Sequence, residues 1–291
     1  MRRPLRGQMP PKAATPLSQT ALAGVAFGEG TFVAIGADGL ILTSHDGREW
    51  VQQNSNTPAR LRAVAFGAGH FIAVGDAGTI MTSPSGMEWT SQPIRNSAYL
   101  NGVVYGKEAF VAVGSGGTIL VSRDGGEWSR RESHSAAYLR SVAFGNGVHV
   151  SVGSDETILI STNGINWTNQ PRIQKACYRS VGFGQGTFAV VGCRDTLLTS
   201  SNGVTWTNWS VGDNPYLHGV AFGDGTFVAV GDGGAIWTSA NGTCWKQETS
   251  TTRRNLKSVA YGNGTFVAVG SAGTIVRSAN GAEWLLGSLA Q

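Results

Sequence analysis

The chain has 291 residues, of which 42 are glycine, 14% are charged and 41% are hydrophobic. This balance excludes a disordered chain, which needs more charge and fewer apolar residues, and no apolar run approaches the ~20 residues of a membrane-spanning helix. The net charge of +4 arises in the first twenty positions, which contain four basic residues and no acidic ones. The remainder is neutral, so the charge does not predict binding to nucleic acid.

Residues 1–21 form the first predicted segment, a basic N-terminal tail that contains four prolines. The segment has no apolar stretch of the kind that a secretory signal requires. We expect a solvated terminus on a chain that is either cytoplasmic or secreted with its signal removed.

Seven tryptophans recur at a constant spacing of 39 residues through the rest of the chain. They are Trp50, Trp89, Trp128, Trp167, Trp206, Trp245 and Trp284. Each ends the pattern Ser-x-[Asp/Asn/Ser]-Gly-x-x-Trp, and no insertion or deletion interrupts the register. A fixed period of this length indicates a repeat architecture, in which each repeat is one structural unit.

Each unit predicts four short β-strands. In residues 217–255 the runs LHGVAFG, TFVAVG, AIWTS and CWKQET alternate with glycine-containing turns. The runs are rich in residues that favour strands, and glycine adopts the positive φ of tight turns at little cost. Repeated four-stranded units of about 40 residues are typical of a β-propeller. We therefore predict an all-β, seven-bladed propeller with blades 22–60, 61–99, 100–138, 139–177, 178–216, 217–255 and 256–291.

Closure of the ring does not require an exchanged strand, because each unit contains four strands of its own. Two segments are candidates for the outer edge of the last blade, Pro11–Leu17 and Trp284–Leu289. Covering that edge would limit edge-to-edge association, and we expect a monomer.

The tryptophan-containing turn resembles the Asp-box (BNR) repeat of sialidases and of photosystem II assembly-factor-like propellers. The resemblance spans all seven units and implies the propeller fold, but it implies no activity, because enzymes, lectins and scaffolds share this structural turn. The present version is one residue shorter, and the aspartate remains only at Asp46 and Asp124. Asparagine and serine also bond the turn backbone, so we predict a turn between the third and fourth strands with its tryptophan packed between blades.

The predicted topology gathers cationic side chains at one rim, which we call the top rim. Antiparallel strands alternate in direction, so the second-to-third turns share this rim with the linkers between blades. The second residues of the innermost strands lie there, nearest the axis: Ala23, Arg62, Asn101, Arg140, Arg179, His218 and Lys257. We call these seven positions the ring. Phenols precede it at Tyr99, Tyr138 and Tyr216. Cations beside phenols predict a site for an anion or a sugar.

The alternative is that acidic residues neutralise the ring. Five aspartates fall in the second-to-third turns of the same rim: Asp38, Asp76, Asp155, Asp195 and Asp232. Surface ion pairs of this kind contribute only about 0–1 kcal/mol. In this interpretation the ring has a structural role and binds no ligand.

Blades 4 and 5 depart most from the repeat. Their second-to-third turns contain Asp155–Glu156 and Arg194–Asp195, where most other blades have small residues. Tyr178 replaces a leucine shared by all other units, and His149 replaces a phenylalanine. We expect these polar groups to cluster on one sector of the top rim.

Three interpretations of this cluster stay open. The first is an acid–base site, with Glu156 or Asp155 as general acid or base; its further candidates are Arg179 and Arg194 as neighbours and Tyr178 and His218 as second proton carriers. In the second, Arg194 and Asp195 join the ring in binding a ligand without chemistry. The third is sequence drift, which loops tolerate.

Cys177 and Cys193 both fall at the top of blade 5, where they form either a disulfide or two small buried residues. No cysteine spacing indicates zinc, so we predict no metal site and no cofactor. The motifs HExxH and GxSxG and the phosphate-binding loop do not occur.

We favour a binding module whose top face holds an anionic glycan, a small acid or a partner protein, with no nucleic-acid partner. The resemblance to the assembly-factor family implies a protein partner on a basic face. The alternatives are an enzyme (a lyase, hydrolase or cyclase) with its site at blades 4 and 5, and a structural scaffold. Sialidase resemblance implies a three-arginine clamp, which Arg62, Arg140 and Arg179 match in residue type alone.

Overall fold

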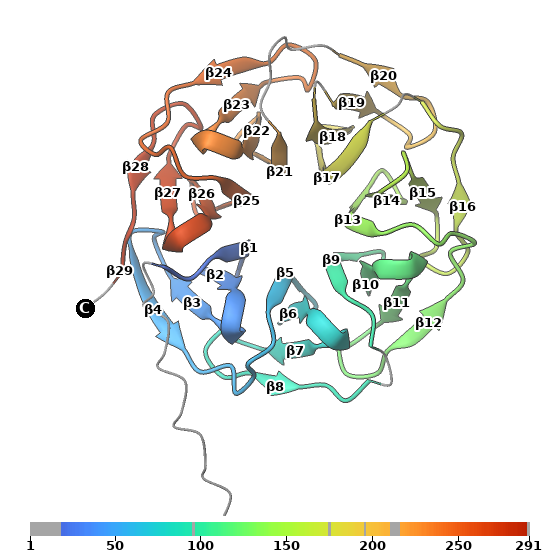
Figure 1. Ribbon diagram of the computed structural model, residues 1–291, viewed down its shortest axis with the longest axis horizontal. Coiled ribbons are helices and arrows are strands. Elements are labelled where there is room, and N and C mark those ends of the chain that lie inside the picture. Colours follow the sequence, from blue (N-terminus) through green and yellow to red (C-terminus); the bar gives the residue numbers. More distant parts are fainter. Residues whose placement is uncertain (1–18, 95–96, 174–175, 195, 210–215, 290–291) are drawn as a thin grey trace, which may run out of the picture.

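The computed structural model describes residues 19–94, 97–173, 176–194, 196–209 and 216–289. These residues form seven antiparallel sheets around a central axis, with helix confined to short 3-10 turns (Figure 1). The predicted all-β, seven-bladed propeller is confirmed. Most of the predicted tail, residues 1–18, lies outside the described residues.

In every blade the strands follow chain order from the axis outward. The innermost strands are β1 (Leu22–Gly28), β5 (Leu61–Gly67), β9 (Leu100–Gly106), β13 (Leu139–Gly145), β17 (Cys177–Gly184), β21 (Leu217–Gly223) and β25 (Leu256–Gly262). The second strands are β2 (Thr31–Gly36), β6 (His70–Gly75), β10 (Ala109–Gly114), β14 (Val148–Gly153), β18 (Thr187–Cys193), β22 (Thr226–Gly231) and β26 (Thr265–Gly270).

The third and fourth strands complete each sheet. The third strands are β3 (Ile41–Ser44), β7 (Ile80–Ser83), β11 (Ile119–Ser122), β15 (Ile158–Ser161), β19 (Leu197–Ser200), β23 (Ile236–Ser239) and β27 (Ile275–Ser278). The fourth strands are β4 (Glu49–Gln53), β8 (Thr90–Ser91), β12 (Ser129–Arg131), β16 (Thr168–Asn169), β20 (Thr207–Asn208), β24 (Lys246–Glu248) and β28 (Leu285–Leu286).

Close approach between neighbouring blades explains the glycine that ends each innermost strand. A Cβ atom on Gly28 would lie 2.0 Å from the ring of Phe66 in the next blade, and one on Gly262 would lie 2.0 Å from Phe27. The same relation joins Gly67 to Tyr105, Gly106 to Phe144, Gly145 to Phe183, Gly184 to Phe222 and Gly223 to Tyr261. The contact therefore runs from blade to blade around the whole ring, where only glycine leaves room for the aromatic side chain.

The core consists of the faces that the blades bury against each other. Trp50, which is 1% exposed, packs with Val267 and Val269 of the preceding blade. Its indole nitrogen donates to the carbonyl of Gly47 at 3.2 Å. Burial on both faces explains the continuous apolar runs of the second strands, because neither side of these strands meets water.

The turn before each tryptophan is held by side-chain acceptors. Asp46 Oδ1 accepts from the backbone nitrogen of Arg48 at 2.8 Å. Asn241 Oδ1 accepts from the equivalent nitrogen of Thr243 at 2.9 Å. The carboxylate and the amide thus offer the same acceptor oxygen to the turn, which explains why asparagine can replace aspartate here.

The C-terminal residues connect the last blade to the first by strand pairing. β28 completes blade 7, and β29 (Ser288–Leu289) then pairs in parallel with β4 of blade 1, as Figure 1 shows. The backbone nitrogen of Ser288 donates to the carbonyl of Arg48 at 2.8 Å. The alternative edge segment, Pro11–Leu17, lies outside the described residues.

His149 occupies an interblade position rather than the top rim, so its grouping with the top-rim polar residues is wrong. It is 1% exposed on β14, at the position where the other second strands have phenylalanine. Its ring lies 4.5 Å from that of Phe144 and 6.1 Å from that of Trp167, centroid to centroid. Burial lowers the pKa of His149, because desolvation disfavours the charged ring.

This burial predicts an acid-sensitive fold. Because the folded-state pKa lies below the unfolded-state value of about 6.5, the free energy of unfolding should fall once the pH drops below that value, by at most about 1.4 kcal/mol per pH unit. His149→Phe restores the residue of the other blades and should lose less stability between about pH 7 and pH 5. Urea unfolding at both pH values measures this difference, and equal losses in the two proteins would contradict it.

Candidate functional site

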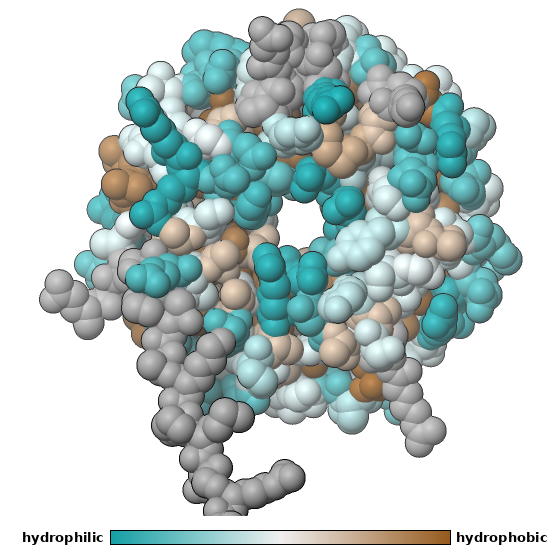
Figure 2. All heavy atoms as spheres, in the orientation of Figure 1, coloured by the Kyte–Doolittle hydropathy of each residue, from teal (hydrophilic) through white to brown (hydrophobic). Residues whose placement is uncertain are grey.

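The seven ring positions meet at one opening on the channel axis. A mouth cavity of about 200 Å³ is lined by Ala23, Arg60, Arg62, Asn101, Tyr138, Arg140, Arg179, His218 and Lys257. A second cavity of about 170 Å³ is lined by the same ring and by the next residues along the innermost strands. Figure 2 shows the channel open through the centre of the molecule, with hydrophilic residues along much of its border.

A β-bulge presents each ring residue to the channel. The pairing of β5 with β6 passes from Leu61 directly to Ala63 and leaves Arg62 without a partner in the ladder. The same register shift skips the ring residue in all seven blades. A bulge changes the direction of the side chain it carries, which explains why this position, rather than its neighbours, faces the axis.

Carboxylates reach the ring from the start of the second-to-third turn, fourteen positions after the ring residue of the same blade, in blades 2 and 6. Arg62 forms an ion pair with Asp76. His218 Nε2 lies 2.6 Å from Asp232 Oδ1, and Lys257 Nζ lies 3.5 Å from the same oxygen. Blades 2 and 6 therefore contribute carboxylates to the ring, so the neutralised arrangement exists on one part of the mouth.

His218 contacts two cations and one carboxylate. Nδ1 lies 3.3 Å from Arg179 Nη1, while Nε2 lies 2.6 Å from Asp232 Oδ1 and 3.0 Å from Lys257 Nζ. Burial lowers the pKa of His218, and the bond to Asp232 opposes this effect. Burial also acts to raise the pKa of Asp232, but the contacts with His218 and Lys257 outweigh it and the pKa is lowered.

Arg140 and Arg179 form no ion pair with a carboxylate of the described residues. The partner position of Arg140 is Ser154, and the Arg140 Nε atom is buried without a hydrogen-bond partner. Burial lowers the pKa of Arg140, and the charge of Arg179 lowers it further. Asp155, a candidate partner of Arg140, lies one position later, where its carboxylate accepts from the Ser154 hydroxyl at 2.9 Å.

Arg179 contacts a sulfur atom at the position where Arg62 contacts a carboxylate. Its Nε lies 3.4 Å from Cys193 Sγ. Cys193 forms a disulfide with Cys177, its partner in the β17–β18 ladder, with 5.2 Å between the two Cα atoms. The two cysteines are therefore bonded rather than simply buried, and the sulfur beside Arg179 is neutral.

The three predicted phenols flank the cations. The Arg62 guanidinium lies 5.1 Å from the ring centroid of Tyr99, that of Arg140 lies 5.2 Å from Tyr138, and that of Arg179 lies 5.9 Å from Tyr216. The Tyr138 hydroxyl donates to Asn101 Oδ1 at 3.0 Å. Each cation thus has an aromatic face, which attracts its positive charge without neutralising it.

Of the four candidate acid–base residues, His218 lines the mouth cavities, whereas Asp155, Glu156 and Tyr178 do not. Tyr178 is fully buried in the core between blades, so it cannot act as a proton carrier for a ligand in the channel. Glu156 pairs with Arg172 at 3.4 Å, and neither residue lines the mouth cavities. Arg194 is exposed and does not line them either, and Asp195 lies outside the described residues.

Glu156 marks a local change in the linker. It takes the position of Gly39, where a Cβ atom would lie 1.8 Å from the carbonyl oxygen of Thr57 in the blade 1 linker. A side chain at this position requires the following linker to take another path. Glu156 keeps the positive φ of this turn position, 57° against 69° at Gly39, and it pairs with Arg172 of the blade 4 linker.

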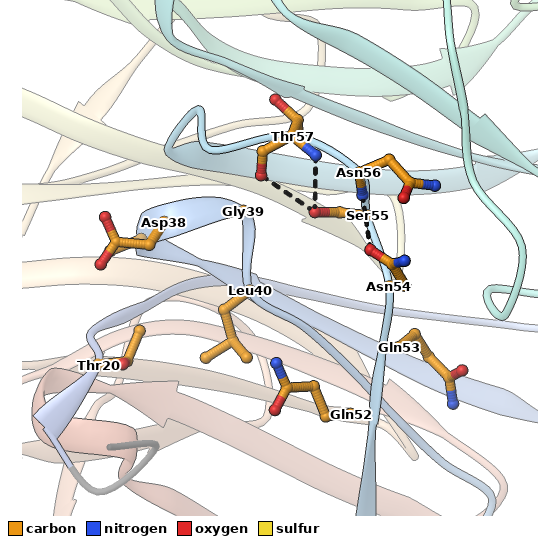
Figure 3. A pocket seen from close by; sticks show the side chains of 11 residues that line it. Thr20, Asp38, Gly39, Leu40, Gln52, Gln53, Asn54, Ser55, Asn56 and Thr57 are labelled. Atoms are coloured by element: carbon orange, nitrogen blue, oxygen red, sulfur yellow. Dashed lines mark hydrogen bonds between the residues drawn. The ribbon is translucent and has the colours of Figure 1, made fainter. Parts of the chain in front are cut away.

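A larger hollow at the top of blade 1 lacks the chemistry of the ring. This cavity has a volume of about 620 Å³. It lies between the turn that contains Asp38 and the linker Asn54–Thr57 (Figure 3). Neutral polar side chains and backbone dominate its lining, which contains no arginine, lysine or aromatic residue. Among the residues that the structure describes, no group of three or more potential metal ligands occurs. No helix in the described part of the chain is long and apolar enough to cross a bilayer.

Comparisons with known proteins show the fold. No protein-family model and no curated protein matches the chain. Similar solved structures include YCF48 from Cyanidioschyzon merolae, with 18% identity over 91% of this chain and 97% of that chain and a TM-score of 0.72. YCF48 bound to D1 peptide has 16% identity over 90% of this chain and 92% of that chain, with a TM-score of 0.74. The computationally designed Ika8 protein has 16% identity, coverage of 92% and 86%, and a TM-score of 0.66.

Removal of the Asp232 carboxylate should change the titration of His218. Because the bond to Asp232 raises a pKa that burial lowers, Asp232→Asn should lower the pKa of His218 further. Side-chain NMR of the five histidines over a pH series measures this, with His149 as an unaffected control in the blade 4 core. An unchanged or higher pKa at His218 would show that Asp232 does not stabilise the protonated ring.

Proposed function

We propose that the protein is a binding module that holds an acidic group of a partner protein at the channel mouth, between Arg140 and Arg179. The observation that carries this proposal is the pair of guanidinium groups on adjacent blades without a described carboxylate partner. Their mutual repulsion, which contributes to the lowered pKa of Arg140, would be relieved by a bound anion. Guanidinium groups bind carboxylates in a bidentate manner and with strong, charge-assisted hydrogen bonds.

The size of the mouth supports a group on a larger partner. The two cavities at the ring, of about 200 and 170 Å³, are each below the roughly 300–1,000 Å³ that is typical of small-molecule pockets. A side-chain or terminal carboxylate fits such a narrow opening, and the exposed rings of Tyr99 and Tyr216 offer apolar contact to the flanking residues. A propeller of similar fold, YCF48, is bound to D1 peptide in a solved structure, which supports a peptide ligand here.

The finer assignments belong to the same proposal. The seven Ser-x-[Asp/Asn/Ser]-Gly-x-x-Trp turns support a place among Asp-box propellers, in which the motif is structural. An anionic glycan is a second ligand class, supported by the phenols beside the cations, and the monomeric state stays a prediction. The enzyme alternative has less support, because Tyr178 is buried and Glu156 is paired with Arg172 away from the mouth.

Substitution of the two arginines tests the proposal. Arg140→Gln/Arg179→Gln should weaken binding of a fluorescent oligoglutamate peptide at least about tenfold, which corresponds to about 1.4 kcal/mol. The control Arg48→Gln/Arg123→Gln removes the same charge from turns on the opposite rim. Fluorescence anisotropy measures both affinities, and equal affinities in the two variants would refute the site. Tighter binding of a uronic-acid oligosaccharide than of the peptide would favour the glycan.

Removal of the aspartates that pair with ring cations tests the proposal in the opposite direction. Asp76→Asn/Asp232→Asn removes the carboxylates that pair with the cations Arg62 and Lys257. Binding of the oligoglutamate peptide should tighten about fivefold, since about 1 kcal/mol of competition within the mouth is removed. Unchanged or weaker binding by the folded variant would show that the ring charges do not contact the ligand.

A further inference from the structure

In blade 5 a disulfide cysteine, Cys193, occupies the position at which blades 2 and 6 have an aspartate. Arg62 and Asp76 are fourteen residues apart, as are His218 and Asp232. Arg179 and Cys193 have the same separation, and Arg179 Nε contacts Cys193 Sγ at 3.4 Å. Cys193 is therefore the structural equivalent of the two neutralising aspartates, with a sulfur atom in place of the carboxylate.

We propose that Cys177–Cys193 is a redox site that sets the anion affinity of the mouth; this inference rests on the proposed function. In the disulfide form the sulfur beside Arg179 is uncharged, so the guanidinium is available to a ligand. In the reduced form Cys193 is a thiolate that pairs with Arg179, as Asp76 pairs with Arg62. The reduced protein then retains Arg140 alone as a ring cation without a counter-charge.

The reduction is a thiol–disulfide exchange with a dithiol reductant. Two electrons and two protons pass from the dithiol, the bond between Cys177 and Cys193 breaks, two thiols form, and the reductant becomes a disulfide. The Cys193 thiol then releases its proton to solvent, because a neighbouring guanidinium stabilises the thiolate. Both cysteines are partly exposed at the top rim, so a soluble dithiol can reach them.

The surroundings of Cys193 favour the thiolate. The described charged or titratable groups near it are Arg179 on β17, Arg194 in its own turn, Tyr216 before β21 and His218 on β21. The carboxylate of the next blade, Asp232, is already bonded to His218 and Lys257. Asp195 lies outside the described residues. The thiolate would therefore meet the Arg179 charge without a described carboxylate beside it.

A titration of the thiol tests the charge pair without any ligand. In a Cys244→Ser background, which removes the exposed free cysteine, Cys177→Ser leaves Cys193 as the single thiol. Thiolate absorbance against pH should give a Cys193 pKa below the ordinary value of about 8.5, and Arg179→Gln should raise it. A pKa at or above about 8.5, or one that Arg179→Gln leaves unchanged, would overturn the inference.

Binding of the oligoglutamate peptide tests the consequence. Reduction of the otherwise native chain should weaken binding about threefold to tenfold. Cys177→Ser/Cys193→Asp should bind weakly with or without reductant, because it supplies a permanent carboxylate. Cys177→Ser/Cys193→Ser should bind like the disulfide form. Weak binding by this last variant would overturn the charge mechanism and assign the effect to the lost covalent link.

Failure of the inference differs from failure of the proposed function. If the disulfide form binds the peptide and reduction leaves its affinity unchanged, the redox site is refuted and the binding module stands. If the disulfide form does not bind the peptide, the role of the redox site in binding is overturned together with the proposed function.

Discussion

The contact between a glycine and an aromatic ring of the next blade is the constraint on which the structure depends. Each innermost strand ends in a glycine that leaves no room for a Cβ atom, and the contact from Gly262 to Phe27 closes the series. Because this contact recurs once per 39-residue unit without slippage, all seven blades approach the axis in the same way. The bulged residues of the innermost strands consequently converge on one opening.

Because the seven blades are equivalent in backbone position, differences in charge between them can be compared residue by residue. All seven bulges present a side chain to the channel, but only blades 2 and 6 place an aspartate at the start of the turn beside it. Arg62 and Lys257 pair with these aspartates, and His218 bonds to Asp232, whereas Arg140 and Arg179 meet serine and sulfur at the equivalent positions. The charge asymmetry follows from the residue at the start of each turn, which is aspartate in blades 2 and 6, serine in blade 4 and cysteine in blade 5.

The repeat register predicted both the fold and the composition of the ring, because strict periodicity places equivalent residues at equivalent points. It did not predict which aspartates pair, since Asp155 lies one position away from the pairing residue and its carboxylate bonds to the Ser154 hydroxyl instead. The burial of His149 and Tyr178 also escaped prediction. Their polar groups indicated a functional cluster, although both replace apolar residues at positions between blades. The repeat register placed Cys177 and Cys193 together and left a disulfide open as one alternative, whereas the β29–β4 contact joins the two ends of the ring and depends on long-range geometry.

The central claim is that Arg140 and Arg179 act together as the anion-binding pair of the mouth. NMR of the arginine Nε–Hε groups during titration with the oligoglutamate peptide tests it most directly. The account predicts that the signals of Arg140 and Arg179 shift along one common saturation curve. The signal of Arg62 should not shift, because Arg62 remains paired with Asp76. Equal shifts across all exposed arginines, or none at Arg140 and Arg179, would contradict the account.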